Sequence, residues 1–381
     1  MPKLYGMQYT KEALLQRVGH LSQLGGVKRV ELRDGNEAGV EAAVFSTGCG
    51  FAFTVLAGRG MDVSSAEYRG QSLCWRSSTG DVNAGFFEPQ GIGWLRSFLG
   101  GLTMTCGLTN VGSACTDQDE LLGHHVDVGD QGATEQPGIH GRVSHIPARD
   151  FSSGGQWEGD DYVMWASGRM RETSVFGPNL CLTRKVSARL GEKRLFVDDL
   201  VENEGYYPTP HMLLYHINIG FPALDEGSAL VSTTQKCTPR DDAAKVGLGD
   251  YARFQAPTRD FHERCYFHEL KADADGFAYA AILNRGFNSG EGFGVYIKYR
   301  LDQLDHFTEW KMNNLGTYVV GLEPANCLVE GRDVERARGA LKHLKRGEQR
   351  SYSLEIGVLT SPAEIQAYED KVKQILGRGR P

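Results

Sequence analysis

The chain has 381 residues with 48 glycines, 13 prolines, 23% charged residues and a formal net charge of −7. This composition is typical of a globular protein and excludes a disordered chain. The acidic balance and the lack of a basic run argue against nucleic acid and anionic membrane as partners. No apolar run is long enough to span a bilayer, and the N-terminus lacks the apolar core of a signal peptide. We therefore expect a cytoplasmic protein.

The eight cysteines stand singly, without a C-x-x-C pair. This spacing predicts neither a zinc knuckle nor a redox dithiol. Buried thiols in a reducing compartment account for them.

The first predicted element is a helix over Lys11–Leu24, capped by Thr10 and ended by Gly25-Gly26. Strand-like runs follow at Val27–Leu32, Val40–Phe45, Phe51–Leu56 and Ser72–Trp75. The next region, Ser77–Asp150, is rich in glycine and has no clear periodicity. It predicts long ordered loops over a scaffold, and such loops often carry function.

Strand patterns resume at residue 162 and continue almost to the C-terminus. The predicted strands are Tyr162–Met170, Asn179–Leu190, Arg194–Glu202, Cys265–Lys271, Gly276–Asn284, Gly294–Tyr299, Phe307–Met312, Thr317–Leu322 and Ser351–Val358. The loop Asn284–Gly294 is suited to a hairpin connection. A closing helix is predicted from its cap Ser361, Pro362 and Glu364, with Gly377 as its stop.

Many short strands, helices at the termini and the lack of β-α-β alternation predict a mainly β fold. We expect a large antiparallel sandwich rather than a nucleotide-binding α/β fold. Neither an internal repeat nor a linker is visible, so one domain spanning 1–381 is predicted.

The most informative stretch is Gly205–Pro222, an apolar, β-prone run that carries two histidines, His211 and His216, and Asn218. Strict alternation places His216 and Asn218 on one face and His211 on the other. Imidazoles buried in an apolar strand need hydrogen-bond partners, or they are retained for a function. A single histidine at such a position is better explained as a core residue whose hydrogen bonds are satisfied.

A second polar position, Glu323, ends the apolar strand Thr317–Leu322 and is followed by Pro324. A carboxylate at the end of a buried strand is well placed for a raised pKa, which suits a general base. The competing interpretation is a glutamate that caps a turn in solvent.

Three further segments contain candidate contacts. His140 and Arg142 lie together in Gly138–Ala148, where Arg142 could contact oxygen atoms through its forked guanidinium or pair with a structural carboxylate. Arg59 and Asp62 could form a structural pair or contact a sugar. The glycine-rich run Leu99–Gly112 lacks the G-K-[ST] of a phosphate loop.

Other catalytic patterns do not fit. The sequence has no G-x-S-x-G elbow and no H-E-x-x-H. His124-His125 and the pair His211 and His216 leave a metal site open, although the second pair lies on opposite faces of a regular strand.

Taken together, these segments resemble the galactose mutarotase (aldose 1-epimerase) superfamily. Pro210 and His216 match the proline and catalytic histidine of its histidine motif, and Glu323 in GLEPAN matches its catalytic glutamate. The segments GGLTMTCGLTNVG and GIHGR are similar to the hexose-phosphate mutarotase branch. The resemblance is closest to a poorly characterised bacterial group of aldose-1-epimerase-like proteins, and it spans nearly the whole chain.

The resemblance implies a β-supersandwich with a sugar-binding cleft and an isomerase that interconverts the anomers of a sugar. Glu323 would take the proton of the anomeric hydroxyl, and protonated His216 would donate to the ring oxygen. The remaining candidates would bind the substrate: His140, Arg142, His211, Asn218, Arg59 and Asp62 at hydroxyls, with Trp310 stacked on the sugar face. No cofactor and no metal are implied.

Two departures from the family bear on the substrate. Tyr215 precedes the histidine where the family has Asn, and Leu99 precedes the double glycine where the phosphate branch has Arg. These departures argue against galactose specificity and against a phosphosugar.

Two other classes of function stay open. The same acid–base pair could epimerise, isomerise or eliminate on a keto-sugar or sugar acid, because fold does not fix function. The second open class is a non-catalytic carbohydrate-binding or sensing module. The sugar, the preferred anomer and the oligomeric state are not predicted.

Overall fold

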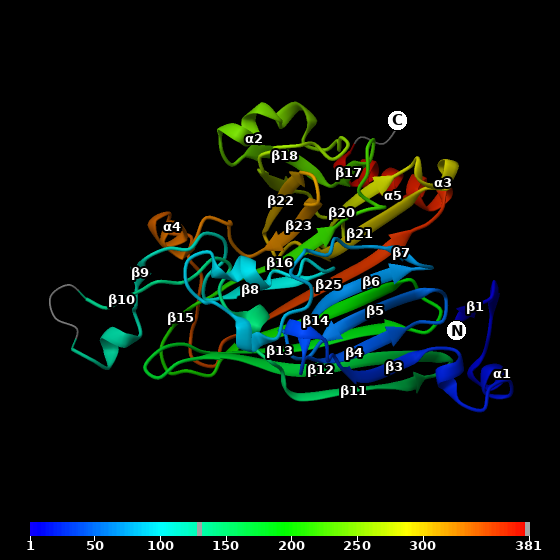
Figure 1. Cartoon of the computed structure of the whole chain (residues 1–381), viewed down its shortest axis with the longest axis horizontal. Coiled ribbons are helices and arrows are strands. Elements are labelled where there is room, and N and C mark those ends of the chain that lie inside the picture. Colours follow the sequence, from blue (N-terminus) through cyan, green and yellow to red (C-terminus); the bar gives the residue numbers. More distant parts are fainter. Residues whose placement is uncertain (128–131, 378–381) are drawn as a thin grey trace.

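The largest sheet of the computed structural model, which describes residues 1–127 and 132–377, has eight antiparallel strands. Its spatial order is β11 (Arg149–Glu158), β12 (Asp161–Thr173), β13 (Asn179–Arg189), β14 (Arg194–Asn203), β25 (Gln349–Leu359), β21 (Phe293–Arg300), β20 (Phe277–Asn284) and β17 (Ala229–Ser232). Burial along β14 alternates strictly, so this strand turns one side towards a core. Figure 1 shows the long strands of this sheet running across the molecule.

A six-stranded and a five-stranded sheet face it. The six-stranded sheet has the order β18 (Thr234–Pro239), β19 (Arg264–Leu270), β22 (His306–Asn313), β23 (Tyr318–Ala325), β16 (Met212–Ile219) and β8 (Met104–Leu108). The five-stranded sheet contains β3 (Gly26–Glu31), β4 (Glu41–Ser46), β5 (Phe51–Leu56), β6 (Asp62–Tyr68) and β7 (Gln71–Ser72). Short pairs complete the described strands: β1 (Lys3–Leu4) with β2 (Met7–Gln8), β9 (Asp117–Gln118) with β10 (Thr134–Glu135), and β15 (Thr209–Pro210) with β24 (His343–Leu344).

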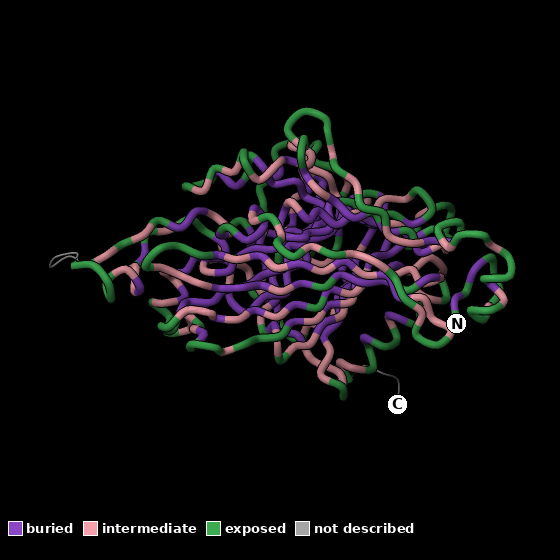
Figure 2. Tube along the Cα trace, turned by 90° about the horizontal axis from the view of Figure 1, so that it is seen from below, coloured by how far each residue is buried: buried purple, intermediate pink, exposed green. Residues whose placement is uncertain are grey.

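The main core lies between these layers. One continuous apolar cluster includes Val55 of the five-stranded sheet, Leu182 and Ile297 of the eight-stranded sheet, and Ile217 and Val320 of the six-stranded sheet. The burial-coloured tube shows this buried interior, with exposed loops around it (Figure 2). The mainly β sandwich expected from the sequence is confirmed.

Strands β16 and β23 are buried along their whole length on both faces. Their inner faces join the main core. Their outer faces are covered by loops, because Trp94, Phe98 and Val329 pack with Met104 and Leu214 in a second apolar cluster. The prediction that Gly205–Pro222 holds a strand with little of its length in water is confirmed.

The helices are short except the last. They are α1 (Lys11–Leu15), α2 (Asp242–Val246), α3 (Phe287–Gly290), α4 (Arg332–Ala337) and α5 (Pro362–Leu376), with short 3-10 turns η1 (Leu21–Gln23), η2 (Gly35–Glu37), η3 (Ala84–Phe86), η4 (Gly93–Ser97), η5 (Leu122–His124), η6 (Val143–His145) and η7 (Leu248–Asp250). Ser361 accepts a hydrogen bond from the Glu364 amide and Gly377 ends α5 in a left-handed conformation, as predicted. None of the described helices is long and apolar enough to cross a membrane.

The sequence was wrong about some elements. The first helix ends at Leu15 rather than Leu24, and a separate turn follows at Leu21–Gln23, where the His20 side chain accepts from the Ser22 amide. Among the strands of four or more residues, β6, β8, β11, β17 and β18 were not predicted. Short helices also occur away from the termini. The predicted single domain spanning 1–381 stays a prediction.

Candidate active site

His216 and Glu323 face each other across two neighbouring strands. The antiparallel register pairs Leu214 with Ala325 and Ile217 with Leu322, which sets His216 directly opposite Glu323. The His216 Nε2 lies 3.2 Å from Glu323 Oε1. Residues exactly two apart on a strand share a face, so His216 follows Leu214 outward while Ile217 points into the main core. The predicted alternation of this strand is confirmed.

The pair opens on a cavity of about 410 Å³ on the outer face of the six-stranded sheet. Aromatic rings form much of its wall. The Trp310 and Phe98 rings stand against the His216 ring with centroids 5.4 Å and 5.3 Å away, and the Trp94 ring lies 4.8 Å from the ring of His140. The lining residues are Trp75, Trp94, Leu95, Phe98, Gly112, Ser113, Ile139, His140, His216, Arg240, Glu263, Cys265, Trp310, Thr317, Glu323 and Val329. This lining, mostly apolar with a few convergent polar groups, is typical of a small-molecule site.

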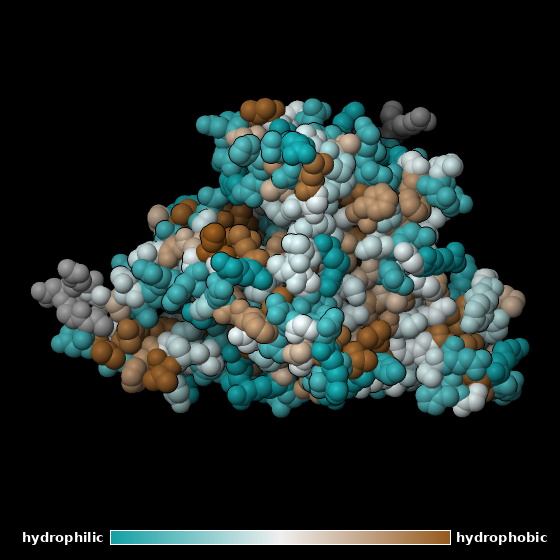
Figure 3. Space-filling view, in the orientation of Figure 1, coloured by the Kyte–Doolittle hydropathy of each residue, from teal (hydrophilic) through white to brown (hydrophobic). Residues whose placement is uncertain are grey.

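The surface around this region is partly apolar. In the orientation of Figure 1, the space-filling view shows apolar side chains gathered over the loops beside α4 and β8 (Figure 3). Ile92 and Leu95 in and next to η4 are exposed, and Leu95 also lines the cavity.

Burial sets the protonation of the pair. It raises the pKa of Glu323 to about 8, and the charge of Glu263 adds to this rise. Burial also lowers the pKa of His216 well below its usual value, helped by the neighbouring His140. At neutral pH the pair therefore carries one proton, which resides on the carboxyl group while the imidazole is neutral. Two buried charges are thereby avoided.

Glycine at position 321 makes room for this arrangement. Gly321 lies two residues before Glu323 on the same face of β23. A Cβ there would lie 2.5 Å from Glu323 Oε1 and 3.0 Å from His216 Cε1. The catalytic candidates can therefore meet only because this position lacks a side chain.

The structure brings some of the sequence-predicted residues to the cavity. His140 and Trp310 line it with Glu323 and His216. Burial lowers the pKa of His140 to about 4, so its imidazole is neutral. Asn218 lies on the same face, but its Nδ2 donates to the backbone oxygens of Gly100 at 3.1 Å and His216 at 3.0 Å.

Other predicted residues lie elsewhere. The Arg59 guanidinium donates to the backbone oxygens of Ser144, Val82 and Ser97 and contacts His145. Its bonds hold loops together rather than reaching the cavity. Arg142 is exposed and does not line the cavity.

Asp62 and His211 belong to the interior between the sheets. Asp62 accepts from the Thr105 hydroxyl at 2.6 Å and from Arg184 at 3.0 Å, so its cation is Arg184 rather than Arg59. The His211 Nε2 lies 2.7 Å from the hydroxyl of Tyr352. Both side chains are placed as structural polar groups.

The sequence did not single out much of the cavity wall. Trp75, Trp94 and Phe98 come from or border the region predicted as ordered loops, where no periodicity marks them. Arg240 follows β18 and Glu263 precedes β19, and neither residue was singled out from the sequence. For Trp94 and Phe98, the only indication was the general expectation that the loops of Ser77–Asp150 carry function.

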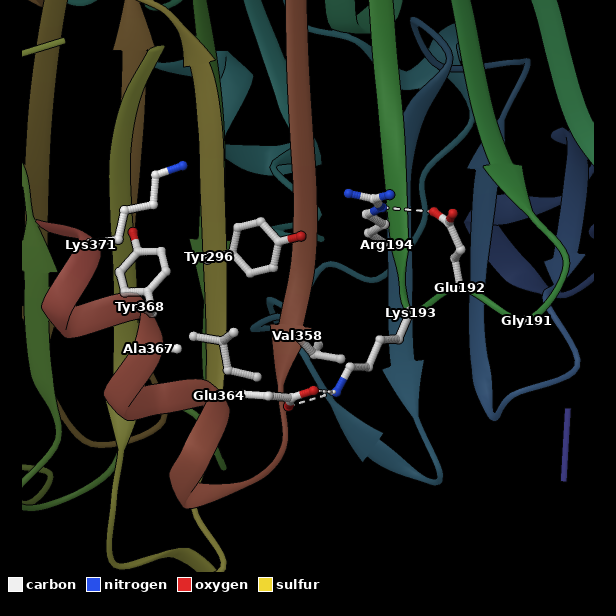
Figure 4. A pocket seen from close by; sticks show the side chains of 11 residues that line it. Gly191, Glu192, Lys193, Arg194, Tyr296, Val358, Glu364, Ala367, Tyr368 and Lys371 are labelled. Atoms are coloured by element: carbon white, nitrogen blue, oxygen red, sulfur yellow. Dashed lines mark hydrogen bonds and ion pairs between the residues drawn. The ribbon is translucent and has the colours of Figure 1, made fainter. Parts of the chain in front are cut away.

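Another hollow of about 560 Å³ lies between α5 and the strands β14, β21 and β25. Its charges are already paired: Lys193 lies 2.7 Å from Glu364, and Arg194 lies 2.7 Å from Glu192. Figure 4 shows these pairs side by side, with Tyr296 and Tyr368 nearby. It lacks a buried acid–base pair, so the cavity at His216 is the stronger candidate.

Across residues 1–127 and 132–377, no group of three or more His, Cys, Asp or Glu side chains is placed to hold a metal ion. His124 and His125 instead pack against the Tyr207 ring. The predictions about metal and cofactor stay predictions.

Solved structures with the same fold identify the class. A "putative aldose 1-epimerase" from Klebsiella pneumoniae is 25% identical with a TM-score of 0.82, covering 93% of this chain and 88% of that one. A galactose mutarotase-like protein from Clostridium acetobutylicum is 14% identical with a TM-score of 0.56, covering 89% and 99%. A galactose 1-epimerase from Lactobacillus acidophilus is 14% identical with a TM-score of 0.53, covering 88% and 99%. The fold is therefore that of galactose mutarotase-like proteins.

The family itself carries no function in its name. A family model described as a domain of unknown function, DUF4432, matches residues 37–358, and the chain belongs to that family. No curated protein matches the sequence.

Proposed function

We propose that this protein is an isomerase that interconverts the α and β anomers of a sugar by opening and reclosing its ring. One observation carries the proposal: a buried acid–base pair, His216 and Glu323, meets at 3.2 Å on the wall of an aromatic cavity. The fold, shared with a galactose 1-epimerase, supports the same conclusion by analogy.

The chemistry of mutarotation suits a pair that shares one proton. The ring oxygen and the anomeric hydroxyl are bonded to the same carbon, so one compact acid–base pair can reach both. Ring opening adds a proton to the ring oxygen, breaks its bond to the anomeric carbon and removes the hydroxyl proton as the carbonyl forms. After the carbonyl rotates, the reverse transfers close the ring on its other face. The pair ends as it began, with no proton gained or lost.

The pKa shifts of the two groups support first roles that differ from those suggested by the sequence. The sequence suggested that Glu323 begins as the base and His216 as the acid. With the pKa of Glu323 raised to about 8 and that of His216 lowered, the resting proton belongs to the carboxyl group. In our proposal Glu323 therefore donates to the ring oxygen, and neutral His216 accepts the hydroxyl proton. The groups exchange roles when the ring closes.

The cavity wall supplies the substrate contacts in this proposal. The exposed part of the Trp310 indole is suited to packing against a sugar ring, because aromatic rings offer a large apolar surface. His140 is the lining imidazole nearest His216, with ring centroids 5.8 Å apart. It is placed to bond a hydroxyl group of the sugar.

The experiment that tests the proposal is NMR of anomer exchange in deuterated water, over a panel of aldoses, ketoses and sugar acids. We expect the wild type to accelerate exchange without placing deuterium on carbon. Glu323→Gln should reduce the acceleration about 10²- to 10⁴-fold, the usual contribution of a general acid or base. Glu309→Gln is the matched control, because Glu309 is an equally buried glutamate of the same sheet outside the cavity.

Two results would contradict this function. Deuterium on carbon or a new product would indicate an enolising epimerase, isomerase or lyase. Sugar binding that survives Glu323→Gln without any acceleration by the wild type would indicate a binding module.

A further inference from the structure

Glu263 joins two side chains at the cavity by its two carboxylate oxygens. Its Oε2 accepts from the indole Nε1 of Trp310 at 2.9 Å, and its Oε1 accepts from Nη2 of Arg240 at 2.9 Å. All three residues line the cavity. Glu263 precedes β19, Arg240 follows β18 and Trp310 is in β22, so one carboxylate ties three segments together.

Trp310 forms part of the cavity wall, and the Glu263 carboxylate holds its indole in position. Its position in β22 is opposite Gly321 of β23, so its ring stands beside the catalytic candidates. The ring centroid lies 5.4 Å from that of His216 and 6.4 Å from that of Phe98. A tryptophan with its N–H bonded to a fixed acceptor loses rotational freedom, which pre-organises the wall before a ligand arrives.

Arg240 is the one Lys or Arg among the described residues that line the cavity. Its charge is already used: Nε donates to Asp241 Oδ2 at 2.9 Å and Nη2 donates to Glu263. These are charge-assisted hydrogen bonds, and because the Glu263 side chain is half-exposed, water screens them in part. An anionic ligand would have to compete with both carboxylates for the same guanidinium.

From this geometry we propose that Glu263 is a specificity-determining residue, which holds Trp310 as the sugar-binding wall and neutralises Arg240, so that the cavity takes uncharged sugars. The inference rests on the proposed function for its substrate class. Neither Glu263 nor Arg240 was singled out from the sequence. The contacts predict that Glu263 itself does not take part in proton transfer.

The reason for the selectivity is electrostatic. A sugar acid or sugar phosphate in the cavity would lie near the Glu263 carboxylate, and Arg240, the one Lys or Arg among the described lining residues, would already be paired. Desolvating its charge without a free partner is costly. An uncharged sugar carries no such cost and can use the aromatic wall.

The central variant is Glu263→Gln. The amide oxygen can still accept from the Trp310 indole, whereas one of the two negative charges that pair with Arg240 is lost. We expect the affinity for a sugar acid relative to its uncharged parent to rise about tenfold, the effect of one freed charge-assisted contact. Glu269→Gln is the control, because Glu269 forms an exposed pair with Lys236 outside the cavity.

A second variant separates the two roles of Glu263. Trp310→Phe keeps an aromatic ring but removes the indole N–H, while the ion pair between Glu263 and Arg240 remains. We expect weaker binding of every sugar without a change in the ratio between charged and uncharged sugars. The same loss of binding with a changed ratio would show that Trp310, and not Glu263, sets the charge preference.

The measurement is ligand-observed NMR titration with matched triplets: galactose, galacturonate and galactose 6-phosphate, and the three corresponding glucose compounds. Tighter binding of uncharged sugars to the wild type, with the ratio shifted only by Glu263→Gln, supports the inference. Tighter binding of an acid or phosphate to the wild type, an unchanged ratio in Glu263→Gln, or no binding of either uncharged sugar overturns it. Because binding is measured apart from exchange, selective binding without accelerated exchange would reject the proposed isomerase and leave the inference standing.

Discussion

The six-stranded sheet contains two buried pairs of histidine and glutamate, and their surroundings differ. His216 lies 3.2 Å from Glu323, and His268 lies 3.4 Å from Glu309. Both pairs join side chains of neighbouring strands, β16 with β23 and β19 with β22. The residue types and the distances are nearly the same.

The difference is access. Both side chains of the His268 pair have an exposed fraction of 0%, and neither lines the cavity. The His268 ring lies 5.4 Å from the rings of Tyr251 and Phe307, and its Nδ1 lies 3.0 Å from the hydroxyl oxygen of Thr234. The His216 pair instead stands on the wall of a 410 Å³ cavity. An acid and a base in contact become a candidate active site only where a ligand can reach them.

Replacing each histidine tests this comparison most strongly. His216→Asn removes the group that accepts the hydroxyl proton, so we expect the rate of anomer exchange per folded molecule to fall about 10²- to 10³-fold. His268→Asn should leave the rate per folded molecule within about twofold. It should lower the melting temperature, because Glu309 loses its nearest partner inside the core.

NMR exchange rates and thermal unfolding, measured on both variants, check this prediction. Loss of exchange in His268→Asn at full folding would remove the distinction between the two pairs. Full activity in His216→Asn would place the acid–base chemistry elsewhere.

Sequence reasoning succeeded where the signals are local. The limits of α5 follow from Ser361, Pro362 and Gly377, because capping depends on the neighbouring backbone. The strand Phe51–Leu56 was predicted with its observed ends, and burial alternates along it up to Val55. The N-terminal helix failed because apolar spacing continued past Leu15, where the chain leaves the helix.

The sequence indicated some residues of the site but not the contacts between them, and the reason is physical. His216 and Glu323 were each marked by a polar residue in an apolar strand, but their contact depends on a register between strands far apart in sequence. Strand β8 was not predicted, because its centre, Thr105-Cys106-Gly107, does not alternate between polar and apolar residues. Its pairing with β16 identifies it as a strand. Arg240 and Glu263 come into contact only in the folded chain, so no local sequence pattern predicts their contact.

Gly321 offers a finer test, because it changes the geometry of one pair without removing either partner. Gly321→Ala would place a methyl group 2.5 Å from Glu323 Oε1 and 3.2 Å from the Cβ of Trp310. We expect exchange to fall about 10- to 100-fold as the carboxyl group is displaced, with a loss of about 1–3 kcal/mol in unfolding free energy from overpacking.

Exchange rates and urea denaturation of Gly321→Ala check both effects. Gly294→Ala, in β21 of the eight-stranded sheet, is the matched overpacking control, since a Cβ there would lie 2.6 Å from Leu283. A similar loss of exchange in both variants would show that general destabilisation, rather than the displaced pair, lowers the rate.

The pH dependence gives the smallest effect and decides the direction of proton transfer. In our assignment the free protein is active while Glu323 is protonated, and its pKa is about 8. After subtraction of spontaneous exchange, kcat/KM should be halved near that pH and fall further above it. Because burial lowers the pKa of His216, no acidic limb is expected from about pH 6 to about pH 7. A rate that instead rises through pH 8 to a plateau would show that ionised Glu323 is the first base. The alkaline limb should persist in Glu309→Gln, because that carboxylate belongs to the closed pair.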